Sequence, residues 1–358
     1  DVTSPDSVLT EANAASDVLW EFTDADLGYT YGAPIITKTA GFGGKWVVIV
    51  PSGYNNASGV GKIWVLDAKT GEVLTTLSTG FGSSTSPSGL AQIAGFTQDY
   101  HNYMTDEVYG GDQYGNVWRF DLRDTDASKW SVGLFAKLTD AEGNTQPVTT
   151  APQIEIDIAN GADRWLFVGT GRLLDTSDLG DPQIQTFYAL RDGTQKTPSA
   201  IVSGSPIIRS DLTPVTDATG TGGITAHGWY DDLAQYSRVV TPFQAVLSTV
   251  VYSATKPQTD PCLTGQSADV FVRSFAEGVS QIDPTAATGT GITCGDEFCT
   301  SEGGAVDAEI IGTTSDGSPT ATLAVAITLG TTGKLATIPI KQPKWSYTHR
   351  LSWRILSE

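Results

Sequence analysis

The chain contains the run Glu107-Val108-Tyr109-Gly110-Gly111-Asp112, followed after two residues by Gly115-Asn116-Val117-Trp118-Arg119-Phe120-Asp121. Both runs are of strand length and rich in Val and aromatic residues, which favour β-strands. The glycines between them are typical of a tight turn. Apolar residues occupy both faces of the first run, as expected for a strand buried on both sides. The stretch therefore predicts two successive buried strands joined by a Gly-rich turn.

The same pattern recurs along the chain. A turn with Pro or Gly leads to a first strand, a strongly apolar second strand, a Gly-rich turn and a third strand. Copies begin near Ala33, Ser88, Ala151 and Thr241, and a weaker copy covers 320–355. A period of roughly 55–90 residues is that of four-stranded propeller blades with loop insertions. We predict an all-β chain, a modified, quinoprotein-like β-propeller of about five blades or part-blades.

Two segments interrupt the repeat. Residues 194–226 and 256–308 are rich in Gly, Thr, Ser, Asp and Pro. We expect them to be loop insertions, either meandering connections or binding elements, because long loops in compact domains often bind partners. Helical patterns of 10–15 residues between the strands are missing, so a parallel α/β sheet is not expected.

The charge balance narrows the classes of partner. Acidic residues outnumber basic ones 40 to 21, which gives a net charge of −19. Nucleic acids and anionic membranes attract basic surfaces, so neither is expected as the main partner. No apolar run in the sequence approaches the ~18–20 residues of a membrane-spanning helix.

Several further stretches identify a family by their order: 18–32, 52–56, 109–122, 167–172, 228–233, 260–262 and 350–354. Together they resemble the C-terminal domain of the PilY family, type IV pilus tip-associated proteins. The resemblance implies a modified β-propeller at the pilus tip on the bacterial cell surface. It also implies roles in pilus biogenesis, surface attachment and twitching motility. The implied partners are minor pilins, the pilus tip complex, and a host or abiotic surface.

The first residues, Asp1-Val2-Thr3, resemble the point just after a blade strand in this family. Family members carry more chain upstream, including a variable adhesive region. We therefore expect residues 1–358 to be the propeller domain from the later part of a longer, exported protein. Upstream blades would be missing, and the opening strands would lack partners.

The family often carries a calcium loop of the form Asp-x-Asp/Asn-x-Asp-Gly-x-x-Asp before the Gly-Asp of the second repeat. Counting back from Asp112, Asp106 falls on the last ligand position and Asn102 on the middle one. Gln98 or Asp99 has to serve as the first ligand. The resemblance thus implies a metal site at Asp99, Asn102 and Asp106.

The residues of this loop argue against tight binding. Ca²⁺ takes about six to eight oxygen ligands, yet Tyr100 stands at the second ligand position and Tyr103 at that of the turn glycine. The alternative is a polar loop in which Asp106 bonds to the next strand. We predict no cofactor, or calcium bound only weakly.

Two other acidic turns are candidate sites. Asp24 and Asp26 could hold a cation, although Asp residues in short turns more often cap backbone N–H groups. The run 61–74, with Asp67 before Thr70-Gly71, resembles a quinoprotein propeller repeat. It raises the rival interpretation of a quinone-dependent (PQQ) dehydrogenase-like enzyme, although a purely structural turn explains it as well.

Catalytic patterns give the rival interpretation little support. The three histidines, His101, His227 and His349, are scattered, and the sequence has no Cys-Cys pair. We therefore predict a non-enzymatic protein that acts by binding, an extracellular pilus adhesin and biogenesis factor. A purely structural platform for a separate adhesive domain is a third interpretation.

Three cysteines complete the candidates. Cys294 and Cys299 are close enough in sequence to form a small disulfide loop, although Cys262 could pair with either one. We predict a Cys294–Cys299 disulfide, with Cys262 free or paired with another chain. Zinc would need a fourth ligand, and no His lies nearby in the sequence.

Overall fold

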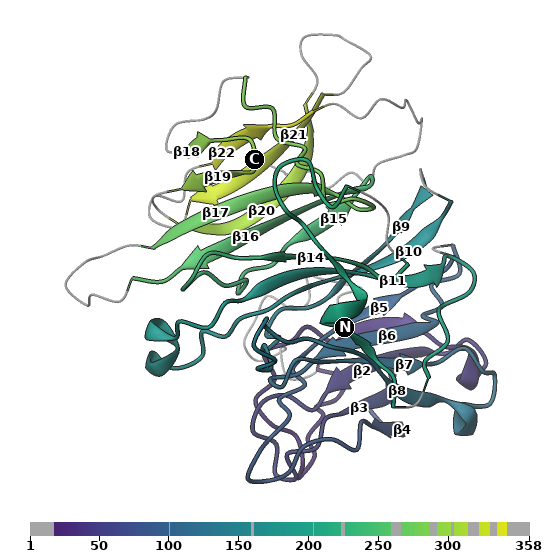
Figure 1. Ribbon diagram of the computed structural model, residues 1–358. Helices are drawn as coiled ribbons and strands as arrows, with labels where there is room; N and C mark the ends of the chain where they lie inside the picture. Colours follow the sequence, from purple (N-terminus) through teal and green to yellow (C-terminus); the bar gives the residue numbers. More distant parts are fainter. Residues whose placement is uncertain are drawn as a thin grey trace, which may run out of the picture.

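The computed structural model describes residues 18–99, 101–158, 161–202, 204–222, 226–258, 266–285, 292–301, 304–313, 322–329 and 335–341. These residues form strands with a few short 3₁₀ turns, and the strands assemble into five sheets in chain order. Figure 1 follows the sheets from the purple strands at the bottom to the yellow strands at the top. The prediction of an all-β, modified propeller is confirmed.

Each of the first two sheets contains a four-stranded antiparallel meander, which the repeat pattern predicts, and the second sheet has a fifth, short strand at its outer edge. The first contains β1 (Ile35–Lys38), β2 (Trp46–Pro51), β3 (Lys62–Asp67) and β4 (Val73–Ser78). The second contains β5 (Gln92–Phe96), β6 (Glu107–Gly111), β7 (Asn116–Asp121) and β8 (Ser131–Lys137).

The remaining three sheets follow the same order with additions. The third contains β9 (Gln153–Asp157), β10 (Asp163–Gly169), β11 (Thr186–Thr194) and β14 (Gly228–Asp232). The fourth contains β15 (Gln244–Val246), β16 (Thr249–Lys256), β17 (Ser267–Ser274), β19 (Phe298–Ser301) and β18 (Ile292–Cys294). The fifth contains β20 (Ala305–Thr313), β21 (Thr322–Leu329) and β22 (Leu335–Pro339). The first strands of consecutive sheets lie side by side.

An apolar core lies between each pair of consecutive sheets. Ile49 of the first sheet and Phe120 of the second share one such core, in which both side chains are fully buried. Phe187 of the third sheet stacks on Tyr252 of the fourth, with ring centroids 3.7 Å apart and planes 3° from parallel. The second strand β6 is buried along its whole length, and most of its residues have no polar side chain, as the sequence indicated.

Glycines at the ends of two second strands let neighbouring blades approach closely. A Cβ on Gly111 would lie 2.3 Å from Val148, and one on Gly169 would lie 2.4 Å from Val239. In both places the valine belongs to the connection that leads to the next sheet. The Val148 N–H donates to the carbonyl of Asp112 at 3.0 Å, and the Val239 N–H donates to Thr170 at 2.9 Å. Gly111 and Gly169 are therefore packing residues.

Within the segment 194–226, expected as a loop insertion, the described residues cross the outer edges of the second and third sheets. Its β12 (Ile207–Ile208) pairs in parallel with β8 of the second sheet, and β13 (Thr213–Pro214) pairs in parallel with β14 of the third. Further along, the Thr221 N–H donates to Glu277, just beyond the fourth sheet, at 2.8 Å. We call residues 195–222 the strap. It covers strand edges that would otherwise be unpaired.

The segment 256–308, also expected as a loop insertion, needs correction. It contains all of β17, β18 and β19 and the start of β20. The Thr- and Ser-rich composition misled the prediction, because the segment also contains the strand run 268–273, in which Val270 and Val272 are fully buried. Strand alternation, not composition, decides such a segment.

The face of the first sheet that points away from the second sheet is covered by residues 18–28. Trp20, Phe22 and Leu27 pack against buried Trp64 and its neighbours. The Trp20 indole N–H donates to the Ala68 carbonyl at 3.0 Å. The first strands that the structure describes, β1 to β4, form a continuous sheet and do not lack partners, contrary to the expectation for the opening strands. Residues 1–17 lie outside the described residues.

Candidate binding surfaces

The loop expected to resemble a calcium site connects β5 to β6. Tyr103, at the position of the family's turn glycine, has a φ of +59°, in the left-handed region that favours glycine. The Tyr103 carbonyl accepts hydrogen bonds from the Lys38 N–H at 2.9 Å and from the Thr37 hydroxyl at 2.8 Å. The loop therefore keeps the turn that the family pattern requires, although a tyrosine occupies it, and is attached to β1.

Each proposed calcium ligand has a hydrogen-bond donor in its own loop. Asp99 accepts from the N–H and the ring of His101, both at 3.0 Å. Asn102 accepts from the Met104 N–H at 2.8 Å, and Asp106 accepts from the Gln98 N–H at 3.1 Å. Tyr100 lies outside the described residues. These bonds are those of a polar turn.

Nearby charges also disfavour a cation at this loop. Burial raises the pKa of Asp106, and the guanidinium groups of Arg164 and Arg123 act on it in the opposite direction. Among the described residues, no group of three or more His, Cys, Asp or Glu side chains is arranged to hold a metal ion. The residues present do not fit a tight calcium site, because Ca²⁺ requires several convergent oxygens.

A buried charge network lies between the second and third sheets, behind this loop. Arg164 contacts Glu107 at 3.1 Å, and Arg119 contacts Asp192 at 2.7 Å. Tyr109 donates to Asp192. All these side chains are nearly inaccessible to solvent. Such pairs position neighbouring blades, because a buried charge without its partner is strongly unfavourable.

The sequence interpretation missed this network. Charged residues begin or interrupt otherwise apolar strands at Glu107, Arg119 and Arg164. This pattern was the sequence signal that could have predicted buried ion pairs. Their partner Asp192 comes from β11, which is remote in the sequence from β6 and β7. Pairing between remote strands cannot be deduced from one chain alone.

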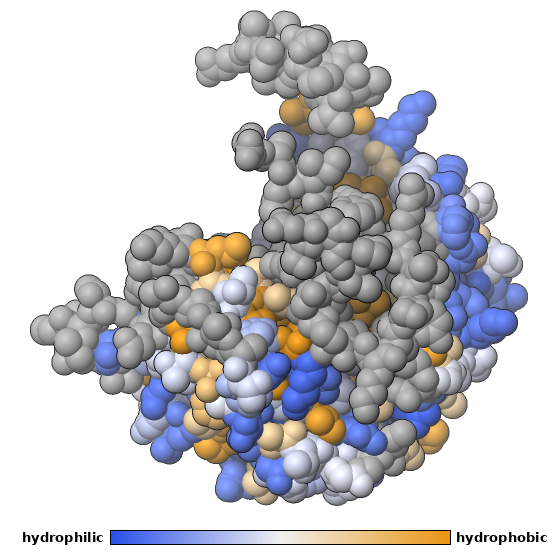
Figure 2. All heavy atoms as spheres, turned by 90° about the horizontal axis from the view of Figure 1, so that it is seen from above, coloured by the Kyte–Doolittle hydropathy of each residue, from blue (hydrophilic) through white to orange (hydrophobic). Residues whose placement is uncertain are grey.

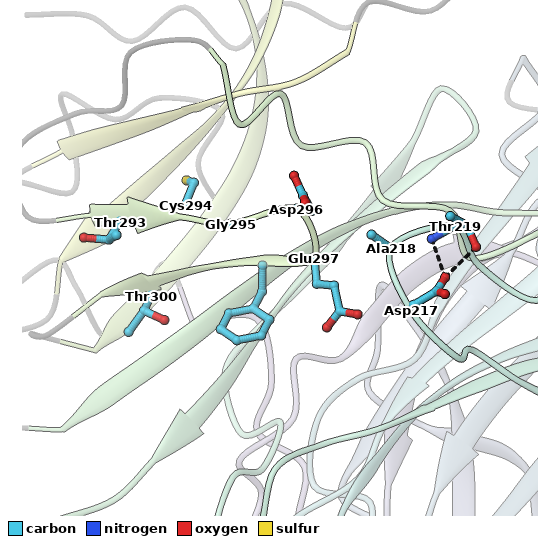
Figure 3. Close-up of a pocket in the computed structure, with 10 residues that line it drawn as sticks. Asp217, Ala218, Thr219, Thr293, Cys294, Gly295, Asp296, Glu297 and Thr300 are labelled. Atoms are coloured by element: carbon cyan, nitrogen blue, oxygen red, sulfur yellow. Dashed lines mark hydrogen bonds between the residues drawn. The ribbon is translucent and has the colours of Figure 1, made fainter.

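A groove of 740 Å³ lies between the strap and the β18–β19 hairpin. Figure 3 shows Asp217 and Glu297 on facing walls, with Asp296 at the tip of the hairpin. The side-chain hydroxyl and backbone N–H of Thr219 donate to Asp217 and lower the pKa of its carboxyl group. The groove therefore presents negative charge to solvent.

A disulfide closes one wall of this groove. The structure joins Cys294 and Cys299, whose Cα atoms are 4.0 Å apart at facing positions of β18 and β19. Cys262 lies outside the described residues. Peptide mapping without reduction would test whether Cys262 pairs with Cys294 or Cys299 instead. A cross-link of this kind restricts the hairpin that carries Asp296 and Glu297.

The groove lies close to a second buried charge cluster. Arg273 contacts Asp231 at 2.7 Å, and Tyr252 donates to the same carboxyl group. Burial raises the pKa of Asp231, and the negative charge of Glu297 raises it further. The charge of Glu297 at the groove therefore affects the ionisation of Asp231 in the blade interface.

The other acidic turns are structural. Asp24 accepts from the Asp26 N–H at 2.8 Å, as in a capped turn. Asp26 is held by Lys62, by Asn56 at 3.2 Å and by the Ser58 hydroxyl at 2.7 Å, and so fixes residues 18–28 on the first sheet. Asp67 accepts from the N–H groups of two residues in its own turn, at 2.9 and 3.2 Å.

The histidines do not form a catalytic arrangement within the described part of the chain. His101 is exposed and contacts Asp99. His227 is exposed before β14, and its carbonyl accepts from the Arg191 N–H at 2.9 Å. His349 lies outside the described residues. None of the described helices is long and apolar enough to cross a membrane.

Five sheets that each contribute a blade, with additional strands on the outer edges, define a modified β-propeller. The family model of the PilY1 beta-propeller domain matches residues 13–214. The chain therefore belongs to the PilY1 β-propeller family.

Curated relatives agree with this assignment. Two proteins of Xylella fastidiosa named as type IV pilus biogenesis factor PilY1 homologs are 30% and 28% identical to the chain. Each alignment covers 65% of the chain, and 18% and 17% of the respective relative. The chain thus spans less than a fifth of the length of these two relatives.

Solved structures agree at the level of the fold. The crystal structure of the Pseudomonas aeruginosa PilY1 C-terminal domain superposes with a TM-score of 0.65 and 19% identity. The match covers 89% of this chain and 74% of that one. A europium-containing methanol dehydrogenase aligns with a TM-score of only 0.42 and 14% identity, too distant to bear on the chemistry of this chain.

Proposed function

We propose that the chain serves type IV pilus biogenesis as a binding module of a larger, surface-associated protein. The observation that carries this proposal is the match of the PilY1 beta-propeller model to residues 13–214. The named biogenesis factors among the relatives support it. The disulfide of the β18–β19 hairpin is in keeping with an exported protein, because disulfides persist in oxidising compartments.

Binding, rather than catalysis, fits the chemistry of the described residues. Two pairs of buried charged groups form ion pairs between blades, Arg164 with Glu107 and Arg273 with Asp231. The carboxylate of Asp67, the residue that suggested a quinoprotein enzyme, accepts a hydrogen bond from the backbone of its own turn. Titration with the quinone in the presence of Ca²⁺ should therefore change neither its absorbance nor the melting temperature of the protein.

The groove beside the strap is the surface we assign to a pilus-related partner. In a chain of net charge −19, its carboxylates favour a partner with a basic segment. The finer parts of the proposal are that this partner is a minor pilin, that the protein is located at the pilus tip and that it attaches the cell to surfaces. Figure 2 shows hydrophilic and hydrophobic residues interspersed over the described surface of one face.

A binding measurement tests this proposal. The soluble domain of each minor pilin would be passed over the immobilised chain, and the Glu297→Lys variant should bind more slowly and with a weaker salt dependence. Glu72→Lys makes the same charge change at an exposed turn of the first sheet and should bind as the parent does. Equal binding by all three proteins would show that the groove is not the contact surface.

A further inference from the structure

Two aromatic side chains and a lysine form an exposed surface at one end of the first sheet. The Trp46 and Tyr103 rings lie 5.7 Å apart between centroids, with planes tilted by 39°. Their side chains remain 45% and 58% exposed. The Lys38 ammonium group lies 5.1 Å from the centroid of the Trp46 ring. We call Lys38, Trp46 and Tyr103 the aromatic platform.

The platform is held rigidly by the backbone. Lys38 and Trp46 face each other across the β1–β2 pair, so both side chains leave the sheet on the same face. Tyr103 reaches them because residues 103–105 bond to β1: its carbonyl accepts from Lys38, and the Thr105 N–H donates to the Lys38 carbonyl at 3.0 Å. The hydroxyls of Thr37 and Thr105 lie 2.7 Å apart beneath this contact. Pre-arranged rings lose little conformational entropy when a ligand binds.

The left-handed turn at Tyr103 attaches the loop to β1, but it does not require a tyrosine side chain. A bulky residue with a φ of +59° is a conformational outlier, and glycine would adopt this turn without strain. The ring nevertheless points outward and is more than half exposed. Backbone strain that places an exposed aromatic ring beside another is the kind of strain that accompanies binding sites.

We propose that the aromatic platform binds an acidic saccharide. Polarised C–H groups on one face of a sugar ring are attracted to the negative face of an aromatic ring. Lys38 forms no ion pair within the described part of the chain, so its ammonium group can receive a carboxylate or sulfate of the ligand. The platform is far smaller than the ~800 Å² that each partner buries in a stable protein interface.

The surroundings of the platform fit a ligand of this kind. Ile36, 66% exposed and two residues before Lys38 on β1, extends the apolar surface. Asn102 and His101, on the same loop as Tyr103, are exposed and carry polar groups for sugar hydroxyls. This proposal does not depend on the role in pilus biogenesis.

Isothermal titration calorimetry with two matched tetrasaccharides tests the proposal. One alternates glucuronic acid with N-acetylglucosamine, and the other contains N-acetylglucosamine alone. We expect saturable binding of the acidic tetrasaccharide and weaker binding of the neutral one. Lys38→Gln should remove this preference, because it keeps the size of the side chain and loses the charge. Failure of the parent protein to bind either tetrasaccharide would overturn the proposal.

Tyr103→Gly separates binding from folding. Glycine suits the left-handed turn, so the melting temperature should stay within about 2 °C of the parent. Loss of one ring should weaken binding of the acidic tetrasaccharide roughly fivefold to tenfold. Tyr31→Ala removes a ring that is 71% exposed elsewhere on the molecule and should leave binding unchanged. Undiminished binding by Tyr103→Gly would exclude the platform as the site.

Discussion

Single residues decide how closely the blades of this propeller approach. Gly111 and Gly169 occupy equivalent places at the ends of second strands, and each contacts a valine from the following connection. Tyr103 shows the opposite case, because a side chain is present where the backbone favours glycine. The sequence indicated glycine turns, but it could not distinguish a glycine needed for its φ from one needed for space.

We predict that Gly169→Ala destabilises the protein by about 1–3 kcal/mol, because the added methyl group overlaps Val239 in a packed interface. Urea unfolding measures the effect. The control is Gly180→Ala, where nothing lies within 4 Å of the new Cβ. A variant at Gly169 as stable as the Gly180 control would contradict the close packing described for this blade interface.

A second residue-scale prediction concerns Asp26. Burial opposes its ionisation, but hydrogen bonds from Lys62 and Ser58 outweigh this effect and lower its pKa from 3.8 to about 2. A lowered carboxyl pKa contributes stability above the unfolded value, and this contribution is lost as the pH falls through about 2. Asp26→Asn should therefore lower the unfolding free energy at pH 7 by about 1–2 kcal/mol.

Unfolding of the Asp26→Asn variant and the parent between pH 7 and pH 2 checks this prediction. The stability difference should shrink below about pH 4 and approach zero near pH 2. Asp24→Asn serves as the control, because Asp24 bonds only to its own turn. A stability difference that stays constant with pH would show that the charge of Asp26 is not responsible.

At the scale of elements, the sequence predicted the second and third strands of the repeats best. The run 107–121 forms β6 and β7 as expected, because apolar strands buried between blades leave a strong pattern. The strap was harder to predict, since β12 and β13 are two-residue strands whose partners β8 and β14 lie in different sheets. Its composition indicated a loop, but a single sequence does not show which edges a loop covers.

The loop between β5 and β6 gives a prediction at the same scale. Asp99, Asn102 and Asp106 accept hydrogen bonds from their own loop, so we predict no calcium binding tighter than the order of 10⁻⁴ M. Calorimetry of EGTA-treated protein measures it. Any weak binding should fall more in Asp106→Ala than in Asp99→Ala, since Asp106 keeps the family spacing to Asp112. Micromolar affinity abolished by Asp106→Ala would show that the family site is functional.

At the scale of the whole molecule, the full chain has a net charge of −19, and a groove lined by carboxylates lies between the strap and the β18–β19 hairpin. Family membership was predictable from the ordered motifs of the sequence. The groove was not, because Asp217 on the strap and Glu297 on the β18–β19 hairpin are 80 residues apart. Only the fold brings the strap to the fourth sheet, through hydrogen bonds such as Ser280 N–H to Ala218 at 3.0 Å.

Complementation tests the central claim, that this chain is a pilus-biogenesis propeller, most directly. In Pseudomonas aeruginosa, the matching part of the PilY1 C-terminal domain would be replaced by residues 18–341 of this chain, and surface pili would be counted. We predict that the chimera restores pili to a strain that lacks PilY1. A chimera that carries Gly180→Ala should restore them equally well. A chimera that is exported and folded but restores no pili would contradict the account.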